Sequence, residues 1–358
     1  MNQTVSIIIR TLPGREHFLD KCLFILSGQL YQDLEPIIVA QYHTDENDVQ
    51  KINEVIEKWE YFFPKIKFIH YLSQTDTRSH SLNLGIESAA GRYLAFLDDD
   101  DKLYPQHYKK LVESLQKTRF AWAYCNITRA DFNKNGQLIS RTFPYHRNHY
   151  LFTEHLQGNF IPIHAPLIDL ERTGVLHFNE TLTKLEDYDF WLRLAHKYQP
   201  LYTHENSGEY CIRADGTNTV TSESLLTHEE QVAKQKEWDE ANLQLRSLKL
   251  KQFGWWVDEF IPMQLPQTPV PTHSADILWG NSSALSINIL GKIYSSYTWK
   301  IIRFGKKINW KLRGKPKKRN LPPADPAAAE KELTKLIFSP AWLMLGPLYA
   351  LERLFRRK

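Results

Sequence analysis

The stretch Tyr93-Leu94-Ala95-Phe96-Leu97-Asp98-Asp99-Asp100-Asp101 places four adjacent carboxylates directly after a short apolar run. Residues 93–97 predict a buried β-strand, because a short apolar run bounded by polar residues fits a strand covered on both faces. Four adjacent carboxylates repel one another and raise one another's pKa. A divalent cation relieves this repulsion, since Mg²⁺ and Mn²⁺ commonly combine carboxylates with substrate phosphates. The alternative is a solvated acidic turn before a helix that begins near Pro105.

The residues before this stretch alternate between predicted strands and predicted helices. Strands are expected at 5–9, 36–40 and 66–71, and helices at 18–26, 49–59 and 79–90. Strand–helix–strand units of this length need right-handed crossovers and a parallel sheet with helices on both faces. A ligand is then expected at the carboxyl ends of the strands, where the four aspartates lie.

Beyond the acidic run the strict alternation ends. The expected elements are helix 105–117, strand 121–126, a hairpin over 127–141 closed at 133–136, helix 186–196 and helix 229–251. Four prolines between Pro262 and Pro271 exclude regular helix or a central strand there. We therefore expect the main domain boundary in that stretch.

Composition narrows the class of protein. The chain has 358 residues, of which 42% are apolar and 24% charged, so wholesale disorder is excluded and there is room for two domains. The cysteines, Cys22, Cys125 and Cys211, are odd in number and widely spaced. This spacing predicts neither a disulfide framework nor a zinc site and favours a reducing compartment. The first ten residues lack the basic region of a signal peptide.

The net charge of +4 conceals an uneven distribution. Eleven Lys and Arg residues and no acidic residue lie between Asp276 and Asp325, so the remainder of the chain is net acidic. A cationic, aromatic helix is expected at 285–307, and an apolar stretch of 16 residues follows at 336–351. That stretch is shorter than the roughly 20 residues of a spanning helix, so we expect attachment to an anionic membrane surface. Nucleic-acid binding is the disfavoured alternative, because no recognised binding module accompanies the basic run.

Several ordered motifs carry a resemblance to a known family. They are Ile7-Ile8-Ile9-Arg10-Thr11, the segment Arg78-Ser79-His80-Ser81-Leu82-Asn83-Leu84-Gly85-Ile86, and the block that ends in the four aspartates. Residues 4–220 resemble the family 2 glycosyltransferases, which are inverting enzymes with the nucleotide-sugar-binding fold called GT-A. The last block matches the Asp-x-Asp motif of that family.

The resemblance implies a metal site and a donor site. Asp98 would contact the ribose or the metal, and Asp100 would bind the Mn²⁺ or Mg²⁺ that bridges the donor's diphosphate. Asp99 or Asp101 could exchange roles with them, since a run of four leaves the register open. The other positions implied to contact the donor are Thr11, Arg78, Asn83 and Asp99, with surface or helix interactions as the alternative for Arg78 and Asn83.

Two positions depart from the family pattern. The second strand of the family usually ends in an Asp that recognises the nucleobase, whereas this strand continues as Val39-Ala40-Gln41-Tyr42-His43. Gln41 is therefore the expected base contact, and stacking of the base on Tyr42 or His43 is the alternative. In the segment 210–218, interpreted as a loop that closes over the diphosphate, Asp215 stands where relatives often have His. Arg213 is expected to contact phosphate, and Asp215 is expected as a further metal ligand.

A second acidic pair opens the helix 186–196. An inverting transfer needs a base that deprotonates the acceptor hydroxyl, and a carboxylate in a first helical turn is rigid and suits the helix dipole. With the resemblance, Asp187 is the expected base and Glu186 the neighbour that orients it or contacts the acceptor. The alternative is ordinary N-terminal helix charge. His164 and Trp191 are the candidate acceptor contacts. A buried structural role is the equal alternative for His164, and the core is the favoured place for Trp191.

Together these observations predict an α/β protein of the GT-A fold, with a mainly parallel sheet flanked by helices and a mostly helical, basic C-terminal extension. The expected domains are a catalytic domain over 1–225, a helical segment and Pro-rich linker over 226–272, and a membrane-associating region over 273–358. The expected activity is metal-dependent inverting transfer of a sugar from a nucleotide-sugar donor to a glycan or lipid-linked acceptor in surface polysaccharide synthesis. The expected location is cytoplasmic, on the inner face of the cell membrane. The alternatives are another nucleotide-sugar transferase or nucleotidyltransferase, or a silent membrane- or glycan-binding adaptor.

Overall fold

The computed structural model describes residues 3–43, 49–214 and 227–254, and beyond them only parts of 257–339. The chain divides into two compact units. One comprises Met1–Tyr150 and Gly158–Arg246, and the other comprises Leu151–Gln157 and Ser247–Lys358. Asp215, the Pro-rich stretch 262–271 and most of the segments 285–307 and 336–351 lie outside the described residues. In the part of the chain that the structure describes, no helix is long and apolar enough to cross a membrane.

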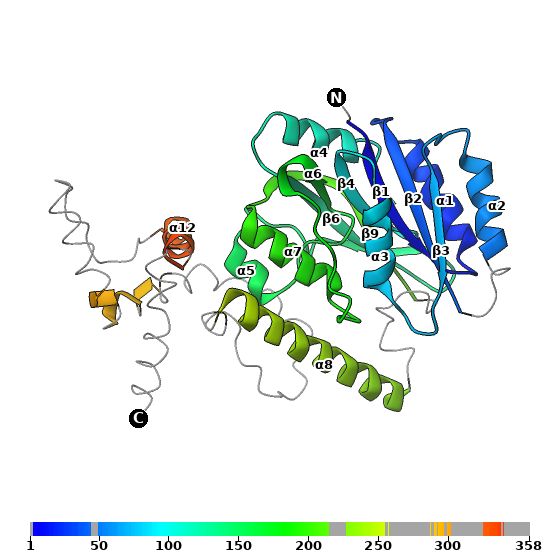
Figure 1. Cartoon of the computed structure of the whole chain (residues 1–358). Helices are drawn as coiled ribbons and strands as arrows, with labels where there is room; N and C mark the ends of the chain where they lie inside the picture. Colours follow the sequence, from blue (N-terminus) through cyan, green and yellow to red (C-terminus); the bar gives the residue numbers. More distant parts are fainter. Residues whose placement is uncertain are drawn as a thin grey trace. The chain divides into compact units, whose positions relative to one another are not determined.

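The first unit is built on a nine-stranded mixed sheet with helices on both faces (Figure 1). The strand order is β3-β2-β1-β4-β8-β6-β9-β5, and β7 pairs with β6. The strands are β1 (Val5–Thr11), β2 (Leu34–Tyr42), β3 (Lys67–Leu72), β4 (Tyr93–Asp98), β5 (Lys102–Leu103), β6 (Trp122–Phe132), β7 (Leu138–Thr142), β8 (Pro166–Asp169) and β9 (Leu201–Arg213).

The longer helices of the first unit lie close to their predicted ranges, whereas the short α6 has no predicted counterpart. The helices are α1 (Glu16–Ser27), α2 (Gln50–Trp59), α3 (Arg78–Ser88), α4 (His107–Gln116), α6 (Leu170–Thr173) and α7 (Glu186–Lys197). Helix α8 (His228–Phe253) runs from the first unit into the second, which also holds α5 (Phe152–Gln157) and α12 (Pro326–Ile337).

The parallel arrangement holds for the first half of the sheet only. Strand β1 pairs in parallel with β2 and β4, and β2 with β3, as the alternating pattern predicts. Beyond β4, the short β8 lies antiparallel between β4 and β6, and β5 is antiparallel to β9. The α/β fold is therefore as expected, but its sheet is mixed.

The segment 210–218 is not a loop throughout, because residues 201–213 form the long strand β9. Its polar run Thr203–Ser207 lacks the apolar alternation that marks a strand, and the strand is held instead by pairing with β6 and β5. Arg213 thereby becomes the last residue of a sheet strand.

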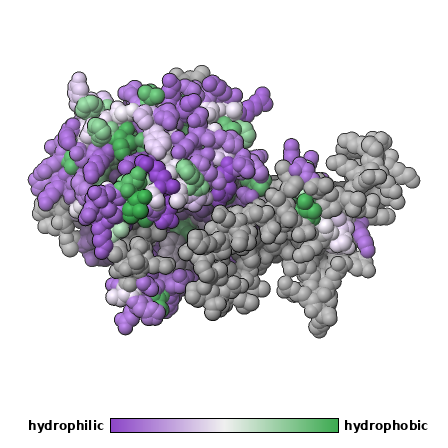
Figure 2. Space-filling model, turned by 180° about the vertical axis from the view of Figure 1, so that it is seen from behind, coloured by the Kyte–Doolittle hydropathy of each residue, from purple (hydrophilic) through white to green (hydrophobic). Residues whose placement is uncertain are grey.

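Close packing at Gly85 brings α3 against the sheet. A β-carbon at this position would lie 2.5 Å from Cγ2 of Ile8 in the buried strand β1, so only glycine permits this approach. The approach places the start of α3 beside the carboxyl ends of β1 and β2. The surface seen from behind is mostly hydrophilic among the described residues, with scattered apolar side chains (Figure 2).

Candidate active site

A cavity of about 390 Å³ opens at the carboxyl ends of β1, β2 and β4. It collects both acidic groups that the sequence singles out, since Asp98, Asp99 and Asp100 line it together with Glu186 and Asp187. The volume falls within the range of small-molecule sites, about 300–1,000 Å³. The position is the one expected for a ligand of an open α/β sheet.

Arginines pair with the acidic run. Arg10 Nη2 lies 2.7 Å from Asp98 Oδ1, and Arg15 Nη2 lies 2.5 Å from Asp99 Oδ1. Thr11 Oγ1 donates a hydrogen bond of 2.8 Å to the same Asp99 carboxylate. Thr11 and Asp99 therefore hold each other at the cavity wall.

The next two aspartates have different surroundings. Asp100 lies 3.1 Å from Arg15 and 3.3 Å from Arg213, whose Nη2 also donates to the Asp100 carbonyl. Asp101 turns into the protein, where it accepts a hydrogen bond from the Cys211 amide and lies 3.0 Å from His164 Nδ1. Asp101 is therefore bonded within the protein interior, while Asp98, Asp99 and Asp100 line the cavity.

The carboxylates differ in how well their charge is compensated. Burial opposes ionisation of Asp98, but the paired Arg10 outweighs it and holds the pKa of that carboxyl below its ordinary value. Burial, together with the charges of Asp101, Asp98 and Asp99, raises the pKa of Asp100 to about 7. The three arginines therefore do not compensate the whole cluster, and an additional cation would be stabilised at Asp100.

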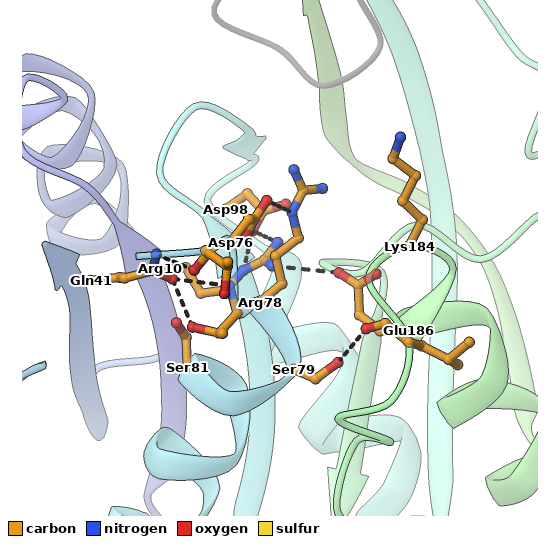
Figure 3. A network of polar contacts seen from close by, with 12 residues as sticks. Arg10, Gln41, Asp76, Arg78, Ser79, Ser81, Asp98, Lys184 and Glu186 are labelled. Atoms are coloured by element: carbon orange, nitrogen blue, oxygen red, sulfur yellow. Dashed lines mark hydrogen bonds and ion pairs between the residues drawn. The ribbon is translucent and has the colours of Figure 1, made fainter. Parts of the chain in front are cut away.

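Arg10 joins the two acidic groups (Figure 3). It lies opposite Asp98 in the register of β1 and β4, and its Nη1 reaches Glu186 Oε1 at 3.5 Å. The Glu186 side chain is only 8% exposed. Arg10 is therefore the cation that keeps a buried carboxylate of α7 next to the acidic run.

Replacing Arg10 by Met is expected to lower the free energy of unfolding by about 3 kcal/mol at pH 7, because two partly buried carboxylates lose their cation. Urea denaturation measures the effect. The matched control is Lys110→Met, which breaks an exposed pair with Glu205 and should cost less than about 1 kcal/mol. Equal urea midpoints for Arg10→Met and the wild type would contradict the stabilising role of Arg10.

The second acidic pair begins α7 after a strained residue. Leu185 has a φ of 62°, in the left-handed region that branched side chains rarely adopt. Asp187 accepts hydrogen bonds from the Tyr188 amide at 2.7 Å and from Asn159 Nδ2 at 2.9 Å. Burial and the neighbouring Glu186 raise the pKa of Asp187 to about 7. A carboxyl with such a pKa is suited to accept a proton near neutral pH.

Gln41 and Arg78, two of the expected donor contacts, line the cavity and are bonded to neighbouring protein groups. The Gln41 amide donates to the Thr75 carbonyl at 2.8 Å and accepts from the Thr77 amide at 3.1 Å. Arg78 lies 2.7 Å from Asp76, whose side chain is 58% exposed. Gln41 therefore holds the chain after β3 in place, and Arg78 and Asp76 face the cavity together.

Four expected contacts do not line the cavity: Asn83, His164, Trp191 and Arg213. Arg213 pairs with Asp100, which does line it. Asn83 is buried and bonded to Phe178 and Glu180, so it ties α3 to the segment before α7. His164 is buried against Asp101. Trp191 is fully buried and stacks on Trp122, with ring centroids 5.9 Å apart. Asn83, His164 and Trp191 therefore have partners outside the cavity in this structure, and the donor contact at the first and the acceptor contacts at the other two stay predictions.

Sequence reasoning missed much of the wall opposite the acidic run. Tyr145, Lys184, Tyr210 and Trp238 all line the cavity. They come, in this order, from the segment after β7, the residues just before α7, strand β9 and helix α8. No local pattern joins these positions. The one available signal is Trp238, a large aromatic residue within a strongly charged helical sequence.

The residues of the cavity are compatible with a divalent cation. No group of three or more metal-ligating side chains converges among the described residues. Mg²⁺ and Mn²⁺, however, are commonly held by one or two carboxylates with substrate phosphates. Burial and the neighbouring carboxylates raise the pKa of Asp100, and a bound cation would favour its charged form. Asp98 and Asp100 would hold such an ion, and the ion would neutralise a departing diphosphate.

The fold and the cavity are those of an α/β protein that binds its ligand at the carboxyl ends of parallel strands. Residues 6–167 match the model of the family Glycosyl transferase family 2. The chain is 26% identical over 207 residues to an uncharacterized glycosyltransferase of Methanocaldococcus jannaschii. The aligned region covers 54% of this chain and 66% of that protein. These matches show that residues 6–167 are similar to the family 2 glycosyltransferases.

Two further similarities were found. A Bacillus subtilis glycosyltransferase assigned provisionally to teichuronic acid biosynthesis is 25% identical over 193 residues, covering 54% of this chain and 72% of that protein. The crystal structure of S. aureus TarS 1–349 in complex with UDP-GlcNAc is 13% identical, covers 79% of this chain and 81% of that chain, and gives a TM-score of 0.49.

Proposed function

We propose that the chain transfers a sugar from a nucleotide-sugar donor to a hydroxyl of a glycan or lipid-linked acceptor, with inversion at the anomeric carbon. One observation carries the proposal: Asp98 and Asp100 line the same cavity as Glu186 and Asp187. One set of carboxylates is thus available for the donor's diphosphate, and the other is available for the acceptor.

Asp187 is the proposed base. Two hydrogen bonds fix its carboxylate, and its raised pKa lets it take the proton of the attacking hydroxyl near pH 7. The acceptor oxygen then bonds to the anomeric carbon from the face opposite the diphosphate, and the bond from that carbon to the diphosphate breaks with its electron pair. Glu186, held by Arg10, orients this end of α7.

Asp98 and Asp100 are the proposed ligands of a Mn²⁺ or Mg²⁺ ion, which supplies neutralising charge for the leaving diphosphate. Arg213, 3.3 Å from Asp100, is the proposed phosphate contact. Asp215 lies beyond the described residues and stays a proposed further ligand. Gln41 and Arg78 line the donor side of the same cavity.

A panel of nucleotide sugars with different bases tests the proposal directly. We expect one of them, in the presence of Mn²⁺, to raise the melting temperature of the full chain and to be hydrolysed slowly to the free nucleoside diphosphate. The absence of both effects across uridine, guanosine and deoxythymidine diphosphate sugars would contradict donor binding. Release of pyrophosphate in place of a nucleoside diphosphate would indicate a nucleotidyltransferase.

Surface polysaccharide synthesis at the inner face of the cell membrane is the proposed setting. The provisional teichuronic acid role of the B. subtilis relative supports the polysaccharide part. The eleven cations between Asp276 and Asp325 support docking on an anionic membrane, at about 1 kcal/mol for each cation near the surface.

We expect the full chain to sediment at low salt with vesicles containing phosphatidylglycerol, but not with pure phosphatidylcholine vesicles. Replacing Lys306, Lys307 and Lys311 together by Gln should weaken the first interaction by roughly a hundredfold. High salt should release the wild-type chain, because the attraction is electrostatic. Equal sedimentation with both vesicle types would contradict the docking.

A further inference from the structure

Aromatic side chains form a distinct part of the cavity wall. Tyr145, Tyr210 and Trp238 line the cavity together with Pro162 and Ile163. The wall on the side of the acidic run is instead made of charged and polar groups. Within this wall, Tyr210 and Trp238 lie outside residues 6–167, which the family model matches.

The two tyrosines hold each other in place. Their rings meet edge to face with centroids 6.1 Å apart, and the Tyr210 ring is backed by the buried His164 at 6.3 Å. Burial and the charge of nearby carboxylates raise the pKa of Tyr145 to about 12. Burial also raises the pKa of Tyr210, and Asp187 is among the carboxylates that raise the pKa of both phenols. The phenols therefore stay protonated beside the proposed base. Among the described residues, neither hydroxyl has a hydrogen-bonding partner.

Trp238 is fixed opposite the start of α7. Glu237 pairs with Lys184, and the Lys184 ammonium lies 5.3 Å from the centroid of the Trp238 ring. One turn and a half further along α8, Gln244 Nε2 donates to the Thr181 carbonyl at 2.8 Å. These contacts fasten α8 to the chain that leads into Glu186 and Asp187. Trp238 thus presents a rigid apolar surface at the edge of the cavity.

A pyranose ring has the complementary chemistry. Its C–H groups form an apolar face that packs on an aromatic ring, while its hydroxyls need hydrogen-bonding partners such as phenols and carboxylates. We propose that Tyr145, Tyr210 and Trp238 form the acceptor subsite and bind the pyranose ring whose hydroxyl is directed at Asp187. This inference rests on the proposed function, and it specifies that the acceptor group is itself a sugar.

The test uses the full chain with its donor site filled by UDP and Mn²⁺, or by the diphosphate that the donor panel selects. Methyl β-glucopyranoside, methyl β-galactopyranoside and their 2-acetamido forms serve as probes in saturation-transfer NMR titrations. At least one should bind the wild type, and Trp238→Ala should weaken that binding about three- to tenfold. Trp238→Phe should retain most of the glycoside affinity of the wild type. Tyr145→Phe should bind the glycoside more weakly, because one hydrogen bond from the phenol is lost.

Two controls keep the outcomes separate. Tyr61→Ala removes an aromatic ring that is 89% exposed and does not line the cavity, so glycoside binding should be unchanged. The calorimetric affinity of Trp238→Ala for the nucleoside diphosphate should stay within twofold of the wild type, which also shows that the variant is folded. Equal glycoside binding by Trp238→Ala and the wild type, or no glycoside binding by the wild type, overturns the acceptor subsite. Loss of diphosphate binding by the wild type instead overturns the proposed function.

Discussion

Asp187→Asn is expected to lose sugar transfer by about 10²–10⁴-fold, the usual contribution of a positioned base, while the affinity for the donor stays within a few-fold. The amide cannot take the proton of the acceptor hydroxyl. The proposed donor ligands, Asp98 and Asp100, lie in a different carboxylate group of the cavity and keep their arginine partners. The rate of sugar transfer to the acceptor and the calorimetric affinity for the donor are measured on the same preparation of each variant.

Glu186→Gln is the matched variant, since it makes the same chemical change at the adjacent residue. It should be milder, because Glu186 is held by Arg10 and serves to orient the start of α7. Near-normal turnover by Asp187→Asn with an inactive Glu186→Gln would exchange the two roles. Normal turnover by both would place the base elsewhere.

The pH dependence provides a second readout for Asp187. Since its pKa is raised to about 7, wild-type transfer should rise with pH through about 7 as the carboxyl loses its proton. The folded state binds this proton more tightly than the unfolded chain, so the contribution of Asp187 to stability is present at pH 4 and lost as the pH rises through about 7. The stability of Asp187→Asn should therefore fall less between pH 5 and pH 8 than that of the wild type. Urea denaturation at both pH values measures this difference.

Both acidic groups could be found from the sequence because their signals are local. An apolar strand followed by carboxylates places Asp98–Asp100 at the carboxyl edge of a parallel sheet, and an acidic pair before an amphipathic segment places Asp187 at a helix start. Their partners are not local. Arg10 and Arg15 are 88 and 84 residues away from the carboxylates to which they donate, and no spacing rule joins them.

The two tryptophans Trp191 and Trp238 also show that contacts between distant parts of the chain could not be predicted from the sequence. Both lie on helices, and the sequence makes only Trp191 a candidate acceptor contact, with the core as the favoured alternative. In the structure Trp191 is buried and stacks on Trp122 from strand β6, whereas Trp238 lies on a charged helix beyond the matched residues and lines the cavity. The strand β9 was missed for a related reason, because its residues 203–207 are polar and only pairing with β6 and β5 makes them a strand.

The register of the metal ligands within the acidic run can be resolved by one pair of variants. Asp100→Asn is expected to weaken Mn²⁺-dependent binding of a nucleoside diphosphate by at least about a hundredfold, because a neutral amide cannot replace the charge that attracts the cation. Binding measured without Mn²⁺ should change little. The fold should persist, since Arg15 keeps Asp99 and Arg213 keeps its bond to the Asp100 carbonyl.

Asp99→Asn is the matched control because Asp99 is adjacent and its carboxylate is already occupied. Arg15 and Thr11 hold that carboxylate at 2.5 Å and 2.8 Å, which leaves it committed to the wall of the cavity. We therefore expect Asp99→Asn to lower the melting temperature but to retain the Mn²⁺ dependence of diphosphate binding. Calorimetric titration of both variants with and without Mn²⁺ separates the two effects. If Asp99→Asn loses the Mn²⁺ dependence and Asp100→Asn keeps it, the metal register is shifted by one residue. The arginine pairing would then describe only the metal-free arrangement of the carboxylates.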